Sequence, residues 1–183
     1  MKAATGGLSS RFSSLRCGSN RRSVSFRSVN RSHSAGYDPE LQRHHLLPLQ
    51  LLSKPCFGSM FAVIGRSSVG FDDFRFNGLL LPASEAATLR TGMPLHRGPH
   101  RSYNELVCER VGSIEAHWKS AIAANAEDAI DDVLMRLRLL QTALRRRLLQ
   151  ERRRFILNRK DPLGTGFDFA ELDAMAESLW EAT

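Results

Sequence analysis

Residues 44–48 read HHLLP, and residues 96–100 read HRGPH. These two stretches hold four of the six histidines in a chain of 183 residues, and Asn77-Gly78 lies between them. Imidazole is the commonest side chain for binding transition metals, and it exchanges protons near neutral pH. The pattern therefore indicates a site with three metal ligands, one base and one amide that orients the base.

Two other interpretations of the four histidines stay open. They could be an incidental grouping, or a structural zinc site in which histidines only hold a small domain together. A histidine on its own is usually an ordinary surface or core residue, which is how we interpret His33 and His117.

The two halves of the pattern are expected in different local structures. His44 and His45 fit a short strand or the turn after it, and residues 75–82 fit a second short strand with a glycine turn inside it. Neighbouring residues on a regular strand point to opposite faces. If both histidines serve one site, the strand must be distorted or strongly twisted there; otherwise one histidine is structural and the base assignment could swap.

Three helices are predicted around and after the second histidine stretch. Residues 83–91 favour a short helix between Ser84 as N-cap and Gly92 as terminator. Proline is tolerated in the first turn of a helix, so Pro99 predicts a helix over about residues 99–123, with His100 in its first turn. Residues 126–158 have apolar side chains every three or four positions, which predicts one long helix.

The long helix carries acids near its start and arginines near its end, which complements the helix dipole. Its apolar stripe is typical of a helix that packs on a core. A homo-oligomer formed through this helix is the alternative, although the heptad pattern of a coiled coil is interrupted at Gln141 and Arg147. Asp168 is expected to cap a last helix that reaches Trp180.

Residues 1–36 are rich in Ser, Arg and Gly, and we expect them to be disordered. Residues 1–37 contain seven basic residues and no acid, so the other residues hold 26 − 7 = 19 basic and 19 acidic side chains. The net charge of +7 therefore belongs to the tail and is poor evidence that the folded part binds polyanions. The alternative to a tail without a specific function is a transit peptide or a phosphate-binding arm.

The separated motifs HHLLP, NGLLLP (residues 77–82) and LHRGPHRSYN (residues 95–104) occur in an order that resembles the AHH nucleases, a branch of the HNH or ββα-metal endonucleases. The resemblance covers about residues 40–115. It implies a two-stranded hairpin packed on a helix around one divalent metal ion. The expected fold class is therefore α+β and mostly helical, with a disordered tail (1–36), a nuclease domain (37–123) and a helical extension (124–183).

The resemblance also implies a role for each matching residue. His44, His96 and His100 would bind the metal, His45 would be the general base, and Asn77 would position that base. The residues expected to contact the substrate are Arg43, Arg97, Arg101, Tyr103 and Asn104, where Tyr103 and Asn104 could instead brace the helix.

The chain departs from the family pattern in two places. Arg43 stands at the position where the family has the alanine of its AHH motif. We expect this difference to affect packing or substrate contact. The interval between His45 and Asn77 is long for a tight hairpin, so we expect an insertion at about residues 53–72 to loop out.

These expectations combine into a metal-dependent endonuclease that hydrolyses phosphodiester bonds in DNA or RNA. All-imidazole ligation favours Zn²⁺ or Ni²⁺, although catalysis can use Mg²⁺. A cognate immunity protein is a conceivable partner, and no apolar run is long enough to span a membrane. A cytoplasmic location is the default, and a secreted or delivered effector is the alternative. The competing function is a non-catalytic, zinc-stapled binding module; a degenerate nuclease kept as a neutralised partner finds no support in the residues.

Overall fold

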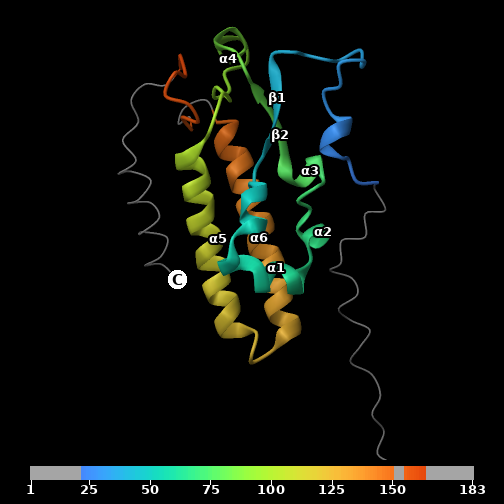
Figure 1. Cartoon of the computed structure of the whole chain (residues 1–183), viewed down its shortest axis with the longest axis vertical. Helices are drawn as coiled ribbons and strands as arrows, with labels where there is room; N and C mark the ends of the chain where they lie inside the picture. Colours follow the sequence, from blue (N-terminus) through green and yellow to red (C-terminus); the bar gives the residue numbers. More distant parts are fainter. Residues whose placement is uncertain (1–21, 151–154, 164–183) are drawn as a thin grey trace, which may run out of the picture.

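The computed structural model describes residues 22–150 and 155–163. Two long helices, α5 (Arg101–Ala121) and α6 (Ala126–Leu148), lie side by side and are joined by a short loop (Figure 1). An antiparallel hairpin of β1 (Leu41–His45) and β2 (Gly78–Pro82) lies at the end of this pair where α5 begins and α6 ends. The fold is α+β and mostly helical, as the sequence predicted.

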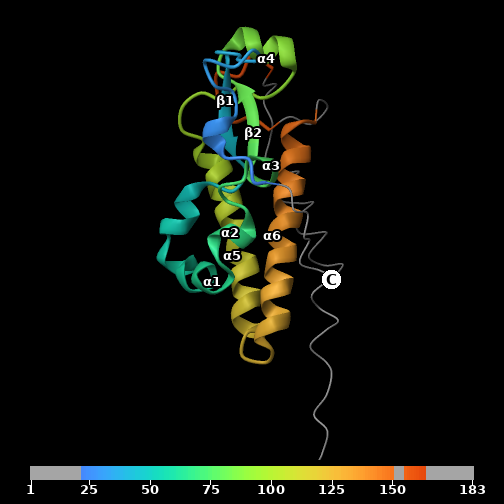
Figure 2. The same cartoon turned by 90° about the vertical axis from the view of Figure 1, so that its right-hand side faces the viewer.

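The segment between the strands was expected to loop out, and this expectation is wrong. It folds into short helices that pack beside the long pair, as Figure 2 shows for α1 and α2. The side chains of Phe57, Met60, Phe61 and Ile64 recur at helical spacing and are buried, so this segment supplies much of the core. The short helices are α1 (Gly58–Ile64), α2 (Arg66–Val69) and α3 (Phe74–Asn77), preceded by 3₁₀ turns at Leu49–Ser53 and Pro55–Phe57.

One continuous hydrophobic cluster joins the hairpin, the short helices and both long helices. Leu46 from the end of β1, Val107 from α5 and Leu137 from α6 are fully buried in it. Burial of each such side chain stabilises the fold by roughly 1.5–3 kcal/mol. The predicted division after residue 123 runs through this shared core.

The second strand is shorter than predicted. The sequence placed a strand over residues 75–82, but Phe74–Asn77 forms a helical turn and β2 begins at Gly78. Asp73 stabilises the turn because its carboxylate accepts a hydrogen bond from the backbone N–H of Arg75 and pairs with the Arg75 guanidinium. The strand register then pairs His45 with Gly78.

Two of the three predicted helices have nearly the predicted bounds. Helix α4 (Glu85–Thr91) is capped by Ser84, whose hydroxyl accepts a hydrogen bond from the N–H of Ala87, and ends at Gly92 in the left-handed conformation. Helix α5 begins at Arg101, so His100 is its N-cap residue and lies just before the first turn.

The long helix α6 ends ten residues before the predicted position, at Leu148 instead of residue 158. Residues 155–158 are not helical, and the side chains of Phe155 and Leu157 are buried. The Phe155 ring packs edge-on against Tyr103 of α5, with ring centres 5.9 Å apart. Both apolar side chains thus join the core from a non-helical segment.

Ordered contacts begin earlier than residue 37, where the sequence placed the end of the tail. The side chain of Asn30 donates hydrogen bonds to the carbonyls of Asp38 and Leu41, and its own carbonyl accepts from the N–H of Asp38. The first 21 residues of the predicted tail and the predicted final helix from Asp168 lie outside the described residues.

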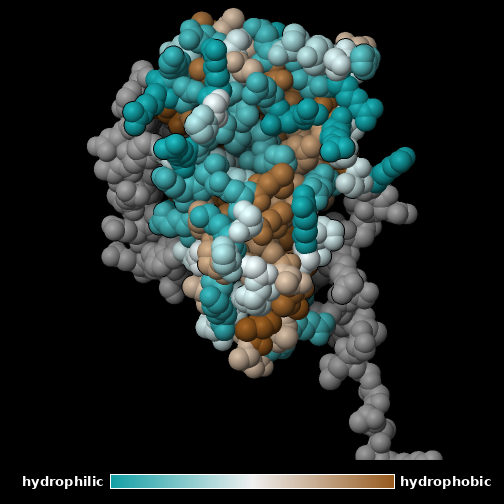
Figure 3. Space-filling view, viewed as in Figure 1, coloured by the Kyte–Doolittle hydropathy of each residue, from teal (hydrophilic) through white to brown (hydrophobic). Residues whose placement is uncertain are grey.

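Polar and apolar surfaces are separated on the face drawn in Figure 3. Hydrophilic residues cover the hairpin end, and apolar residues gather lower, over the region of residues 49–64, where Leu49 and Val63 are exposed. Among the described helices, none combines the length and apolarity that crossing a bilayer requires.

Gly78→Ala should destabilise the protein, because an added Cβ would clash with the Phe74 ring and force that ring to move. We expect a loss of about 1–3 kcal/mol in the free energy of unfolding, measured by urea denaturation.

Gly112→Ala is the matched control, since Gly112 lies inside α5 and nothing stands within 4 Å of its added Cβ. This variant should gain up to about 1 kcal/mol from better helix propensity. Equal effects of the two substitutions would contradict the close packing of Phe74 on Gly78.

Candidate metal centre

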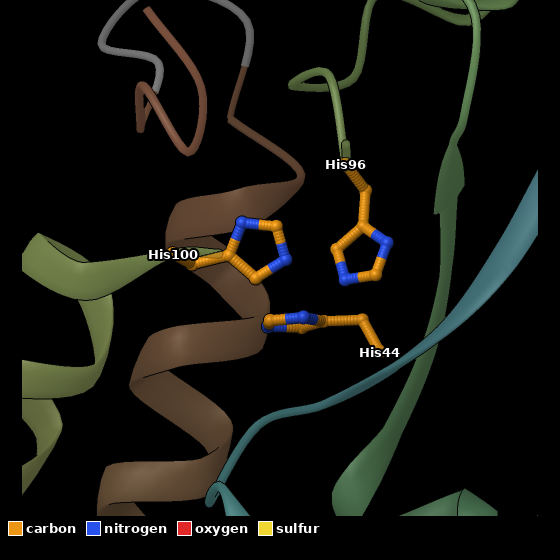
Figure 4. A group of neighbouring side chains, drawn as sticks. All are labelled: His44, His96 and His100. Carbon is orange, nitrogen blue, oxygen red and sulfur yellow. The ribbon is translucent and has the colours of Figure 1, made fainter. Parts of the chain in front are cut away.

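Three histidines from different segments converge at the hairpin end. His44 comes from β1, His96 from the loop before α5, and His100 from the N-cap position of α5. Each offers one ring nitrogen, and these nitrogens all lie within 4.8 Å of one another. Figure 4 shows the three rings arranged around a common point.

Outer partners orient two of the rings. The Nδ1 atom of His96 lies 3.2 Å from the Oε1 atom of Gln42, and the Nδ1 atom of His100 lies 3.5 Å from the carbonyl oxygen of Leu157. Each contact leaves Nε2 as the atom that the ring can offer to a metal. Metal-binding histidines typically use such a second partner to fix the ring and its tautomer.

His44 is the buried member of the group. It is only 4% exposed, and among the described residues its Nε2 atom has no hydrogen-bond partner. A buried polar atom without a partner is costly unless something binds it. The orphaned nitrogen of His44 is therefore the strongest sign that a cation fits here.

The environment keeps the cluster neutral. Burial, helped by the nearby charges of His96 and His100, lowers the pKa of His44 to about 2. Burial, with the charge of His100, lowers the pKa of His96 to about 4, and burial lowers the pKa of His100 as well. Neutral imidazole is the form that binds a metal, and three such donors suit one ion with metal–nitrogen bonds of about 2 Å after small ring movements.

The C-terminal part of the described chain supports the loop that carries His96. The Oδ2 atom of Asp161 accepts a hydrogen bond of 2.8 Å from the N–H of Leu95, and the side chain of Asn158 donates to the carbonyl of Arg97. The sequence did not predict this support, and its only local signal is that Asp161 precedes a proline.

His45 lies on the other face of β1 from His44, as strand alternation requires. Its imidazole is half-buried and stacks flat on the Phe26 ring, with ring centres 3.8 Å apart and an angle of 8° between the planes. Burial lowers the pKa of His45; the charge of Asp72 opposes this shift and that of Arg66 adds to it. His45 is therefore neutral at neutral pH and able to accept a proton.

Asn77 holds the backbone after His45 instead of contacting its ring. The fully buried amide accepts a hydrogen bond of 2.7 Å from the N–H of Leu47 and donates to the carbonyls of Leu47 and Phe71. No described hydrogen bond joins the Asn77 amide to the His45 imidazole, and the amide instead clamps the backbone two residues farther along the chain.

Gln141 of α6 completes this amide cluster. Its buried Nε2 atom lies 3.3 Å from both the Oδ1 atom of Asn77 and the carbonyl oxygen of Val69, and it donates to each. In the sequence Gln141 stood out only as a break in the apolar stripe. Its position links the long helix to the residues behind His45.

The expected substrate-binding residues differ in how accessible they are. Tyr103 is 2% exposed, and its hydroxyl donates a hydrogen bond of 2.7 Å to the carbonyl of Leu46 while its ring packs against His44. Burial also raises the pKa of Tyr103. The burial of Tyr103 and its hydrogen bond to Leu46 favour the bracing role that the sequence left open beside substrate contact. The other four are Arg43, Arg97 and Arg101, which are exposed, and Asn104, which is half-buried.

Comparison with known proteins identifies the family. A family model matches residues 25–143, well over half of the chain, and describes a nuclease family of the HNH/ENDO VII superfamily with conserved AHH. The chain carries Arg43-His44-His45 as its version of that motif. No curated protein and no solved structure matches the chain.

Without metal, the stability of the protein should fall as the pH drops below about 6.5. The unfolded chain takes up protons on its histidines near pH 6.5, whereas folded His44 and His96 resist protonation until about pH 2 and about pH 4. Thermal unfolding in chelator between about pH 7 and pH 4 measures this loss.

His96→Asn removes one of the histidines that resist protonation, so the stability of this variant should fall less steeply as the pH drops. His33→Asn changes an exposed histidine and serves as the control. Identical slopes for all three proteins would contradict the lowered pKa of His96.

Proposed function

The chain belongs to the AHH family of nucleases, and from this premise we propose that it hydrolyses phosphodiester bonds in DNA or RNA with one divalent cation and a histidine base. Nucleases of this superfamily use a divalent metal ion. The observation that carries the proposal is the convergence of three ring nitrogens within 4.8 Å, with a fourth, neutral imidazole on the opposite face of the same strand.

The described part of the chain offers three metal ligands and no fourth. Structural zinc sites usually have four protein ligands, whereas catalytic sites keep a position open for water or substrate. The ligand set therefore favours catalysis over a zinc-stapled binding module. His44, His96 and His100 would hold the ion, and their imidazole nitrogens favour Zn²⁺ or Ni²⁺, although catalysis can use Mg²⁺.

The register of β1 is regular at His44 and His45, so the distortion expected if both served one face is absent, and the proposal instead places the two histidines on opposite sides of one phosphodiester. The attacking and leaving oxygens lie on opposite sides of phosphorus in an in-line displacement. His45 would accept a proton from water as its oxygen bonds to phosphorus, and the bond from phosphorus to the leaving oxygen would break with its electron pair. A divalent cation bound by the three histidines would supply positive charge beside that leaving oxygen.

The surrounding residues would serve binding and orientation. Asn77 would fix the backbone that carries His45 by clamping Leu47. Arg97 and Arg101 are exposed beside the ligands His96 and His100, where guanidinium groups could contact the substrate phosphates. A cognate immunity protein and assembly through α6 stay predictions, and the substrate is DNA or RNA.

Cleavage should depend on the metal and on His45 separately. Purified protein is incubated with a plasmid and with an RNA, with Mg²⁺, Zn²⁺ or Ni²⁺ and with chelator. Chelator should abolish cleavage. His45→Ala should retain bound metal and lose about 10²–10⁴-fold in rate, as expected for removal of a general base.

His100→Ala should lose both bound metal and cleavage, and metal content after dialysis separates the two variants. His33→Ala, at an exposed site in the described segment before β1, is the control and should behave like the wild-type protein. A zinc-stapled module predicts bound metal without cleavage, and undiminished cleavage by His45→Ala would refute the assignment of the base.

A further inference from the structure

We propose that Phe26 is a positioning residue for the base, which holds the plane of the His45 ring, and that Arg43 holds Phe26 in place. This inference rests on the proposed function, because it assumes that His45 accepts the proton. The juxtaposition that carries it is the flat stack of the two rings, 3.8 Å between centres and 8° between planes.

The segment that carries Phe26 is tied to the body of the protein just before the stack. The N–H of Val24 donates to Oδ1 of Asp73 at 3.2 Å, and the carbonyl of Val24 accepts from the N–H of Phe74 at 2.7 Å. Ser25 forms a β-bridge with Asp73. Backbone hydrogen bonds therefore fix Phe26 relative to the helical turn that precedes β2.

Arg43 adds a second tie from the strand itself. Its guanidinium donates a hydrogen bond of 3.0 Å to the carbonyl oxygen of Phe26. An alanine, which the family motif has at this position, could not make this contact. The departure of this chain from the AHH motif therefore coincides with the residue that anchors Phe26, two positions before the base.

A flat stack controls the ring without blocking it. Rotation about the last side-chain bond of histidine is broad, so a free imidazole samples many planes. Phe26 covers one face of the ring, whereas the nitrogen lone pair and N–H lie in the plane of the ring and point outward from its edge. The Phe74 ring meets Phe26 edge-on at 5.1 Å and itself lies against Gly78, the strand partner of His45. The His45, Phe26 and Phe74 rings and the Gly78 backbone thus support one another in a closed circuit of contacts.

Phe26→Leu and Phe26→Tyr test the proposal. Leucine keeps an apolar side chain of similar bulk and removes the flat surface, whereas tyrosine keeps that surface. Phe26→Leu should lower kcat by about ten- to a hundredfold, the size expected for a misplaced catalytic group, with KM and bound metal unchanged. Phe26→Tyr should restore most of kcat. The assay uses whichever of plasmid or RNA the wild-type protein cleaves.

A spectroscopic readout is independent of cleavage. The ring-carbon protons of His45 should resonate upfield in the wild-type protein and in Phe26→Tyr, because the aromatic ring current shields them, and should move downfield in Phe26→Leu. Phe76→Leu is the matched control: this phenylalanine is exposed and makes no described contact with His45, so both kcat and the His45 signals should stay unchanged.

Arg43→Ala restores the family residue and separates anchoring from substrate contact. Loss of kcat together with the downfield shift supports the anchor, whereas an increase in KM alone overturns that part of the proposal. Equal activity of Phe26→Leu and Phe26→Tyr, or faster cleavage by Phe26→Leu, overturns the role of Phe26. Cleavage by His45→Ala at the wild-type rate refutes instead the assignment of His45 as the base, on which this inference rests, and the His45 signals of the Phe26 variants still report the stack in that case.

Discussion

The buried amide of Asn77 is the constraint on which the rest of the site depends. Its oxygen and nitrogen make hydrogen bonds to the backbone on both sides of the hairpin and to Gln141 of α6, so the amide is fully satisfied in a place without exposure to water. A buried polar group with all its partners specifies one arrangement, because any shifted register would leave it unpaired. The amide therefore fixes where β1 ends, and with it the positions of His44 and His45.

The candidate metal centre is assembled from segments that lie far apart in the chain. Its three histidines come from β1, from the loop before α5 and from the start of α5, while their supports come from residues on both sides of these elements. Each segment on its own is short and would not hold its shape. The shared hydrophobic core makes their positions interdependent, and α6 contributes both to this core and, through Gln141, to the hydrogen bonds of Asn77.

The sequence predicted those features that depend on local chemistry. The capped helix α4 and the start of α5 near Pro99 follow from residue type and spacing, whereas the grouping of His44, His96 and His100 was expected from the resemblance to the AHH nucleases. The features that it missed depend on contacts between distant segments. The end of α6 is set by burial of Phe155 and Leu157, and the polar Gln141 interrupts the apolar stripe because it serves Asn77 across the core. Similarly, no local pattern marked Phe26 or Asp161, since each acts on a loop or strand far away in the chain.

The hydrogen bond between Asp161 and Leu95 spans 66 positions and closes the loop that carries His96. During synthesis on a ribosome, the histidines emerge well before this carboxylate does. A growing chain would therefore expose all three imidazoles while the loop between α4 and α5 still lacks its last restraint. The metal-binding geometry described above is complete only after the chain has folded back past α6, so the order of synthesis itself delays the fully formed site.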